Sequence, residues 1–220
     1  MNKRKGIAAV LLFVMALTLL GGCAKKFDAS GYTKSILDLC YKGETKEYMK
    51  LTESTKEEAE AVYSENLDYM VEEFSQWDLS DDILKKYRDF FADLNKNVKY
   101  TVGEAKEDKK GNFTVEVTVE PILNLAETYT TFMEKIQEYT EQLQADVQNG
   151  GAIPTEEEIL NKEVEMYYDV LRESLDAGVH YGEAQTITVH VELNKDKVYE
   201  IPEADFRALD ALTLSTDIGE

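Results

Sequence analysis

Cysteine and histidine are scarce in this sequence, and basic residues are far fewer than acidic ones. Its 220 residues include two cysteines, Cys23 and Cys40, and two histidines, His180 and His190. It also lacks a nucleophile elbow, a phosphate-binding glycine loop, a His-Glu-x-x-His motif and a Cys-x-x-Cys pair. We therefore predict no catalytic residue, no cofactor and no specific metal site, and leave open a site built on the two histidines.

The excess of acidic over basic residues limits the choice of partners. The sequence has 24 basic and 44 acidic residues, a formal net charge of −20 at pH 7. Nucleic acids and anionic lipid surfaces both attract positive patches, so this balance argues against either as a binding partner. A basic partner or loosely held cations are compatible with the charge, and so is a simple role in solubility.

An apolar run near the N-terminus has the layout of a secretory signal. It extends over residues 7–20, is interrupted by Thr18 alone, and follows three basic residues at positions 3–5. A basic start followed by an apolar stretch too short for a comfortable membrane span is typical of such signals. We predict that residues 1–22 are a signal peptide and exclude them from the fold.

The end of this run predicts a lipid anchor. Leu20, Gly21, Gly22 and Cys23 resemble the lipobox of bacterial lipoproteins, in which the cysteine thiol receives a diacylglycerol and becomes the new N-terminus. Two or three acyl chains hold a protein stably on a membrane. We expect lipidation at Cys23 and a location on the extracytoplasmic face of the cell membrane, with the membrane itself as one partner. An ordinary signal peptide and an uncleaved anchor helix are the alternatives.

Lipidation of Cys23 would leave Cys40 without a disulfide partner in the same chain. Cys40 follows Ile36 by four positions in a helical pattern, so we interpret it as a small buried apolar residue and not as a reactive thiol. Cleavage after residue 22 would also remove the three basic residues at positions 3–5. The mature chain would then carry 21 basic and 44 acidic residues, a net charge near −23.

The rest of the chain is predicted to form a short tether and one domain. Residues 23–31 are interpreted as a lipidated tether, whose flexible part would span only about 15 Å. Residues 32–220 are predicted to be a single α+β extracytoplasmic domain. A division into two subdomains near residue 121 is the alternative.

Apolar periodicity predicts helices and strands in alternating groups. A spacing of three to four residues predicts helices over 32–42, 44–51, 55–77, 81–94, 122–148 and 155–177, and after Pro202. Two capping boxes, Thr55 with Glu58 and Thr155 with Glu158, mark helix starts. The third helix is predicted to include Phe74 and Trp77. In the first long helix the residues predicted to face inward are Leu125, Tyr129, Phe132, Ile136, Leu143 and Val147.

Alternation of apolar and polar residues predicts two β-hairpins, at about 98–120 and 184–201. Isolated hairpins are marginally stable, so we expect the two to join in one small antiparallel sheet. The predicted fold class is α+β, with helices packed on one face of this sheet. The many tyrosines, 13 against 8 phenylalanines, are interpreted mainly as amphipathic rings at the boundary of the core. Stacking of exposed tyrosines on sugars or peptides in a groove beside the sheet is the alternative.

Several stretches resemble a known group of proteins. Besides the lipobox, these are residues 27–32 (Phe-Asp-Ala-Ser-Gly-Tyr), residues 41–44 (Tyr-Lys-Gly-Glu), the strand 115–121 and residues 201–205 (Ile-Pro-Glu-Ala-Asp). They resemble uncharacterised surface lipoproteins of Gram-positive Firmicutes that carry a domain of unknown function. The resemblance implies a Gram-positive surface lipoprotein, covers nearly all of the mature chain and transfers no catalytic or binding residue.

These observations favour a non-enzymatic envelope module that binds a small ligand or a protein partner. An envelope hydrolase is the first alternative, and it would need two carboxylates with perturbed pKa values in one cleft. A structural or assembly factor is the second, and it would need an exposed apolar patch.

Overall fold

The computed structural model describes residues 27–72, 79–195 and 197–215. Among these residues it contains seven helices and five strands, which confirms the predicted α+β class. Contacts within the chain define two compact units whose segments alternate along the sequence. The sheet unit comprises residues up to Asn66, Lys99–Val119 and Ala184–Leu212, and the helical unit comprises Leu67–Val98, Glu120–Glu183 and residues from Thr213.

Four helices contribute to the sheet unit: α1 (Ala29–Lys42), α2 (Lys46–Thr52), most of α3 (Lys56–Val71) and α7 (Glu203–Thr213). Helix α1 begins three residues earlier than predicted, because the Asp28 carboxylate accepts a hydrogen bond from the Gly31 backbone N–H at 2.8 Å. This is a helix N-cap, and it turns the end of the predicted tether into the first helical turn. Helix α1 ends at Gly43, which has a left-handed backbone conformation (φ 68°).

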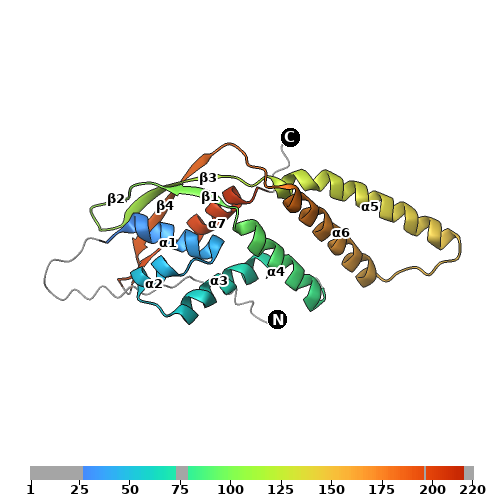
Figure 1. Cartoon of the computed structure of the whole chain (residues 1–220), viewed down its shortest axis with the longest axis horizontal. Helices are drawn as coiled ribbons and strands as arrows, with labels where there is room; N and C mark the ends of the chain where they lie inside the picture. The colour runs from blue at the N-terminus through green and yellow to red at the C-terminus, as the bar shows by residue number, and fades with distance from the viewer. Residues whose placement is uncertain (1–26, 73–78, 196, 216–220) are drawn as a thin grey trace. The chain divides into compact units, whose positions relative to one another are not determined.

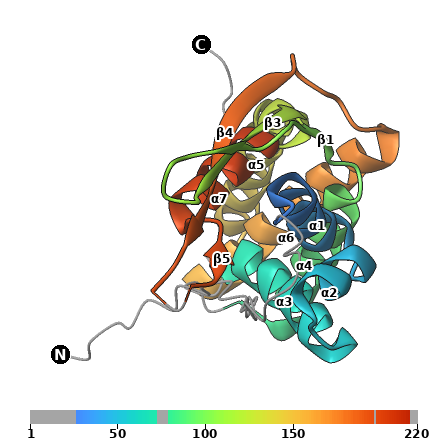
Figure 2. The same cartoon turned by 90° about the vertical axis from the view of Figure 1, so that its left-hand side faces the viewer.

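The sheet joins the two predicted hairpins. Its strands are β1 (Lys99–Val102), β2 (Lys106–Glu107), β3 (Phe113–Glu120), β4 (Gln185–Leu193) and β5 (Tyr199–Glu200). Their order is β1-β3-β4-β5, with β2 also paired to β3. The long antiparallel pairing of β3 with β4 (Figure 2), which places Val115 opposite Val189, connects the hairpins as the alternation predicts.

One face of this sheet forms the core of the sheet unit. Phe113 and Val115 of β3 and Val191 of β4 are buried in one cluster with Tyr32 and Ile36 of α1. Figure 1 shows α1 and α7 on the same side of the strands. Residues of β3 that alternate with the buried ones are polar and more exposed, so helices cover one face of the sheet, as predicted.

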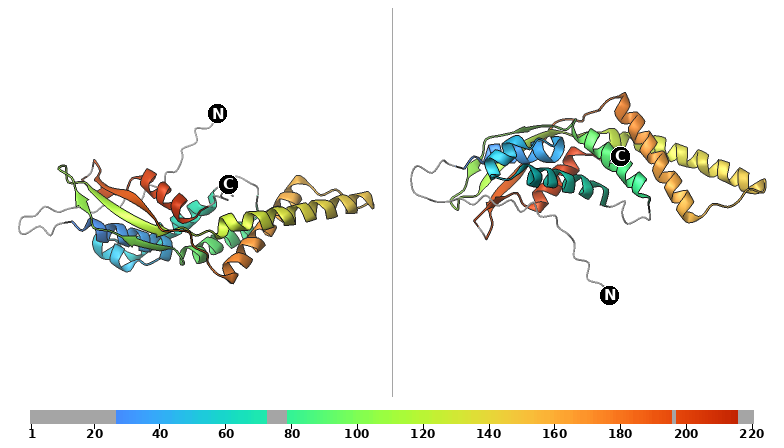
Figure 3. Two further views of the ribbon diagram at one scale, coloured as in Figure 1. Left: turned by 90° about the horizontal axis from the view of Figure 1, so that it is seen from above. Right: turned by 60° about the horizontal axis from the view of Figure 1, so that its bottom comes forward.

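The helical unit contains α4 (Asp81–Asn95), α5 (Asn124–Gln148) and α6 (Glu156–Ala177). Helices α5 and α6 form an antiparallel hairpin (Figure 3), which lies in the sequence between the paired strands β3 and β4. Helix α4 packs on α6, where the Tyr87 hydroxyl donates to the Val164 carbonyl at 2.7 Å. Phe74 and Trp77, predicted to extend α3, lie outside the described residues.

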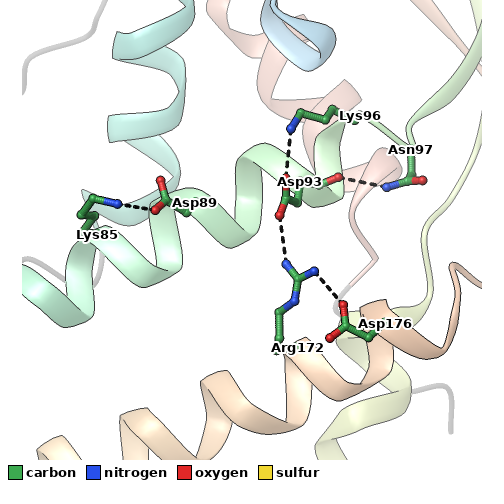
Figure 4. Close-up of polar contacts among 7 residues, drawn as sticks. All are labelled: Lys85, Asp89, Asp93, Lys96, Asn97, Arg172 and Asp176. Atoms are coloured by element: carbon green, nitrogen blue, oxygen red, sulfur yellow. Dashed lines mark hydrogen bonds and ion pairs between the residues drawn. The ribbon is translucent and has the colours of Figure 1, made fainter.

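An arginine-centred network also ties α6 to α4 (Figure 4). The Arg172 guanidinium donates to Asp93 of α4 at 3.0 Å and to Asp176 of its own helix at 2.6 Å. Lys96 donates to the other Asp93 oxygen at 2.9 Å. These hydrogen bonds, that of Lys96 first, lower the pKa of Asp93. Because the groups are well exposed, the network orients the hairpin more than it stabilises it.

Candidate functional site

A buried polar cluster in the sheet unit is the first candidate. Asp38 of α1 is 8% exposed and accepts hydrogen bonds from the Tyr100 hydroxyl and, at 2.5 Å, from the Lys34 ammonium. The Lys42 ammonium lies 4.7 Å from the centre of the Tyr100 ring. Burial, together with the hydrogen bond to the Asp38 carboxylate, raises the pKa of Tyr100. Its hydroxyl is therefore held as a donor to Asp38.

A second carboxylate adjoins this cluster. The Tyr41 hydroxyl donates to Asp210 of α7 at 2.7 Å, and the Tyr41 and Tyr100 rings lie 6.0 Å apart. Burial raises the pKa of Asp210 to about 6, although the hydrogen bond from Tyr41 acts in the opposite direction. The cluster thus contains a carboxyl group with the raised pKa that a general acid needs.

A small cavity elsewhere in the sheet unit does not involve these groups. A cavity of about 10 Å³ in the sheet unit is lined by Tyr32, Ile36, Leu39, Tyr48, Val62, Ile201 and Phe206. It has room for about one water molecule, and none of the four residues of the Asp38 and Asp210 pairs contributes to its lining. The cluster is therefore a packed, hydrogen-bonded link between α1, β1 and α7 more than an open catalytic cleft.

An exposed apolar ridge on α5 is the second candidate. Tyr129 and Met133, four positions apart and hence on one side of the helix, are 44% and 45% exposed. Tyr129 was predicted to face inward, and this prediction is wrong. The inward-facing position on this part of α5 is taken by Phe132, whose ring centre lies 4.8 Å from that of Tyr167 on α6.

Packing is loose along most of α5. The fully buried residues of this helix are Asn124, Leu125, Ala126 and Thr128, all in its first two turns. From Tyr129 to Gln148 every residue is half-buried or exposed. The predicted stripe residues Phe132, Ile136, Leu143 and Val147 are half-buried. Helix α6 thus covers only part of the apolar surface that α5 presents.

A buried asparagine fixes the base of the hairpin. The Asn124 amide donates to the Ser174 hydroxyl at 2.8 Å and to the Gly178 carbonyl at 2.9 Å, and its oxygen accepts from the His180 backbone N–H at 2.9 Å. Ile122, fully buried just before α5, bridges to Tyr181. The start of α5 is therefore held rigidly against the end of α6, which positions Tyr129 one turn further on.

The predicted capping box is present at the tip of the hairpin, where α6 begins. Thr155 and Glu158 form the expected capping box, with the Glu158 N–H donating to the Thr155 hydroxyl at 3.2 Å and the Thr155 N–H donating to the Glu158 carboxylate at 2.8 Å. The hydrogen bond from the Thr155 N–H, and a second one from the Thr155 hydroxyl, lower the pKa of the Glu158 carboxyl group. Ile153 at the tip is 78% exposed, a second apolar position that the hairpin does not cover.

Strong negative charge accompanies these apolar positions. The segment from residue 124 to residue 177 carries 13 acidic and 3 basic residues, a net charge of −10. Four of the acids, Glu127, Glu134, Glu138 and Glu141, are exposed and share one side of α5 because they are spaced by seven, four and three positions.

The residues singled out in the sequence are not brought together in one site. The predicted lipobox, Leu20, Gly21, Gly22 and Cys23, lies outside the described residues. Cys40 is completely buried, as predicted, and burial raises the pKa of its thiol.

Each histidine has its own carboxylate partner. His180 Nδ1 lies 2.6 Å from Glu127 in the helical unit, and His190 Nδ1 lies 2.8 Å from Asp205 in the sheet unit. In the described part of the chain, no group of three His, Cys, Asp or Glu side chains is placed to hold a metal ion.

Most tyrosines are buried or half-buried. Tyr32, Tyr41, Tyr48, Tyr87 and Tyr199 are buried in the core. The two tyrosines among the exposed large apolar residues of the described chain, Tyr69 and Tyr129, lie on α3 and α5 and not on the strands. Among the described helices, none is both long enough and apolar enough to cross a membrane.

Sequence reasoning missed Met133, Asn124 and the Tyr41–Asp210 pair. Met133 could have been recognised, because it widens the apolar stripe of α5 beyond the narrow seam that one antiparallel neighbour covers. The Tyr41–Asp210 pair joins residues 169 positions apart, and no local sequence pattern indicates such a contact.

The molecule is thus an α+β protein in which a helical hairpin is inserted, along the sequence, between β3 and β4, two strands that pair in the sheet. A similar structure is that of YcdA from Bacillus subtilis subsp. subtilis, named a "putative lipoprotein", with a TM-score of 0.56 and 16% sequence identity. The match covers 86% of this chain and 56% of that one, so the chain spans a little over half the length of YcdA. No family model and no curated protein matches the chain. At this identity the likeness shows a shared fold.

Proposed function

We propose that the protein is a lipoprotein, anchored through Cys23 to the extracytoplasmic face of the cell membrane, that binds a protein partner and catalyses no reaction. The lipobox and the lipoprotein name of the structural neighbour support the anchor. The single observation that carries the binding role is the exposed ridge of Tyr129 and Met133 on a hairpin that buries little of its own apolar surface. Neighbouring exposed apolar side chains on one helix face are a candidate interaction site.

A protein partner fits the structure better than a small ligand. Sites for small molecules are concave and enclose most of the ligand, whereas the cavity in the sheet unit has room for about one water. The ridge on α5 is an exposed part of a helix surface, and such surfaces bind other protein surfaces. An assembly factor is a special case of this proposal, since it would use the same exposed ridge.

Photo-crosslinking in cells tests the binding role. A photoreactive phenylalanine analogue in place of Met133 should give a discrete adduct in the membrane fraction. The same analogue in place of Ala61, which is exposed on α3 in the sheet unit, is the helical control and should give none. Absence of an adduct from position 133, with the protein present at its normal level, would overturn the proposal.

Fractionation tests the anchor. The Cys23→Ala variant, which has no thiol to acylate, should be released into the medium or accumulate as an unprocessed precursor. Metabolic labelling with a fatty acid should label the unmodified protein and leave the variant unlabelled. An acylated variant that stays on the membrane would refute the assignment of Cys23.

The hydrolase alternative is favoured by one observation, the raised pKa of Asp210 beside the Asp38 cluster. It predicts that Asp210→Asn abolishes an envelope activity, and the binding proposal predicts that partner crosslinking survives this change.

A further inference from the structure

The surface beside the hairpin has a definite arrangement of apolar and charged groups. Helix α6 contacts the side of α5 that carries Asn124 and Phe132. At 100° per residue, Tyr129 and Met133 come next around α5, followed by the row Glu127, Glu134, Glu138 and Glu141. An apolar ridge is thus bordered by α6 on one side and by exposed carboxylates on the other.

This geometry matches the packing of one more helix. An amphipathic helix that lies along α5 would pack its apolar residues against Tyr129 and Met133, as the side chains of neighbouring helices interdigitate. The residues that flank its apolar face would lie next to the glutamate row. In coiled coils, charged residues in the equivalent positions form ion pairs between helices and determine which helices associate.

Charge limits which helix can bind. The hairpin segment 124–177 has a net charge of −10 and the whole chain −20. A second copy of this chain would bring two such surfaces together, and an anionic membrane would likewise be repelled. Lysine or arginine side chains, by contrast, can lie over the ridge with their stems and reach the carboxylates with their charges.

We propose that the ridge of Tyr129 and Met133, with the row Glu127, Glu134, Glu138 and Glu141, is a docking surface for a positively charged amphipathic helix of a partner protein. This inference rests on the proposed function and names the chemistry of the partner. Binding also covers the part of α5 that lacks fully buried residues, so it should make residues 129–148 less prone to local opening.

The test is a fluorescence anisotropy titration of the detergent-solubilised full chain with synthetic 21-residue peptides. The probe carries leucine at helical spacing on one face and lysine elsewhere. One control peptide has the same composition with the leucines shuffled, and another has glutamate in place of lysine. We expect saturable binding of the probe, at least tenfold weaker binding of both controls, and an affinity that falls as salt rises.

Variants of the chain locate the binding surface. The double variant Tyr129→Ser, Met133→Ser should bind the probe about tenfold more weakly, because buried apolar anchors dominate such interfaces. Ile153→Ser, which also removes an exposed apolar side chain of the hairpin, is the matched control and should bind within about twofold of the unmodified chain. Glu134→Gln with Glu141→Gln should weaken binding and flatten its dependence on salt. Far-UV circular dichroism checks that all variants keep their helices.

The outcomes separate the two proposals. Equal binding of the shuffled peptide, or no effect of the double variant, overturns the docking surface. A self-associated wild-type chain that the double variant dissociates, seen by sedimentation equilibrium, assigns the ridge to a second copy and also overturns it. If the probe does not bind but position 133 still crosslinks to a protein in cells, the inference falls and the proposed function stands. If position 133 gives no adduct, the proposed function itself falls.

Discussion

The sheet unit and the α5–α6 hairpin bury their apolar residues to very different degrees. In the sheet unit Leu39, Cys40, Val115 and Val191 are completely buried and packed in one cluster. In the hairpin no residue of α5 beyond Thr128 is fully buried. Most helical stability in proteins comes from such packing and not from intrinsic propensity. The difference therefore indicates a stable scaffold in the sheet unit and a hairpin that opens at low free-energy cost along its outer length.

The same contrast separates the two candidate sites. Asp38 and Asp210 accept hydrogen bonds from the Tyr100 and Tyr41 hydroxyls, so these carboxylates already have partners within the protein. Tyr129 and Met133, by contrast, are 44% and 45% exposed to solvent. Polar groups that are buried and satisfied specify a fold, whereas exposed apolar groups on a loosely packed element invite a partner.

The largest expected effect is a difference between two identical substitutions. Leu39→Ala should lower the free energy of unfolding by about 3 kcal/mol, because it leaves a cavity in a closed core. Leu143→Ala in the half-buried outer part of α5 should cost about 1 kcal/mol or less. Urea unfolding of both variants gives the comparison. Equal costs would mean that Leu143 is as well covered in solution as Leu39, and that the contrast between the two regions is wrong.

The next effect concerns the base of the hairpin. Asn124→Ala removes three hydrogen bonds that hold α5 to the end of α6 and should cost about 2–3 kcal/mol. Amide hydrogen exchange should accelerate throughout α5 and α6 and stay unchanged in β3. Asn161→Ala, which removes one hydrogen bond to the Glu157 carbonyl on the same hairpin, is the control and should cost about 1 kcal/mol or less. Faster exchange in β3 as well would show that the hairpin does not open independently.

A pH-dependent effect should come from the sheet unit. The pKa of Asp210 rises from its ordinary 3.8 to about 6 on folding, so the folded state binds this proton more tightly than the unfolded state does. The resulting stabilisation is fully present below pH 3.8 and is lost as the pH rises through 6. Relative to the unmodified chain, Asp210→Asn should therefore gain about 2 kcal/mol of stability between pH 4 and pH 7.

Urea unfolding at both pH values measures this change. Tyr41→Phe sharpens the test: it removes the hydrogen bond that lowers the pKa of Asp210, so the transition should move to higher pH. An Asp210→Asn variant whose stability relative to the unmodified chain is the same at pH 4 and pH 7 would contradict the assigned environment of this carboxyl group.

Local sequence patterns predicted the local parts of this structure. Both capping boxes are formed as the Thr-x-x-Glu spacing indicates. The alternation agrees with the burial of Phe113, Val115, Val117 and Val119 in β3 and of Val189 and Val191 in β4, because a one-residue slip would expose all of them. Leu193 at the end of β4 has the same parity but is 36% exposed. The requirement that two hairpins share one sheet followed from their marginal stability alone.

The candidate sites could be predicted only in part. Periodicity identified the apolar stripe of α5, but it does not show how much of that stripe a neighbouring helix covers, and Tyr129 was misplaced for this reason. The Tyr100–Asp38 contact spans 62 positions and depends on how α1 packs on the sheet. Such a pair depends on the tertiary fold, and the sequence does not show which of the many tyrosines reaches the carboxylate.

The smallest expected effect uses the two capping boxes, which are chemically the same but lie in the two different regions. Thr55→Ala at the start of α3 and Thr155→Ala at the start of α6 each remove one side-chain cap, a change that costs about 1 kcal/mol where the helix end unfolds with the whole domain. If the outer hairpin opens independently, Thr155→Ala should leave the global free energy of unfolding nearly unchanged and instead speed amide exchange near residues 156–160. Thr55→Ala should lower the global value. Equal losses of global stability from both variants would mean that the hairpin tip unfolds only with the rest of the chain, and the exposed ridge would then have to be explained without a loosely packed hairpin.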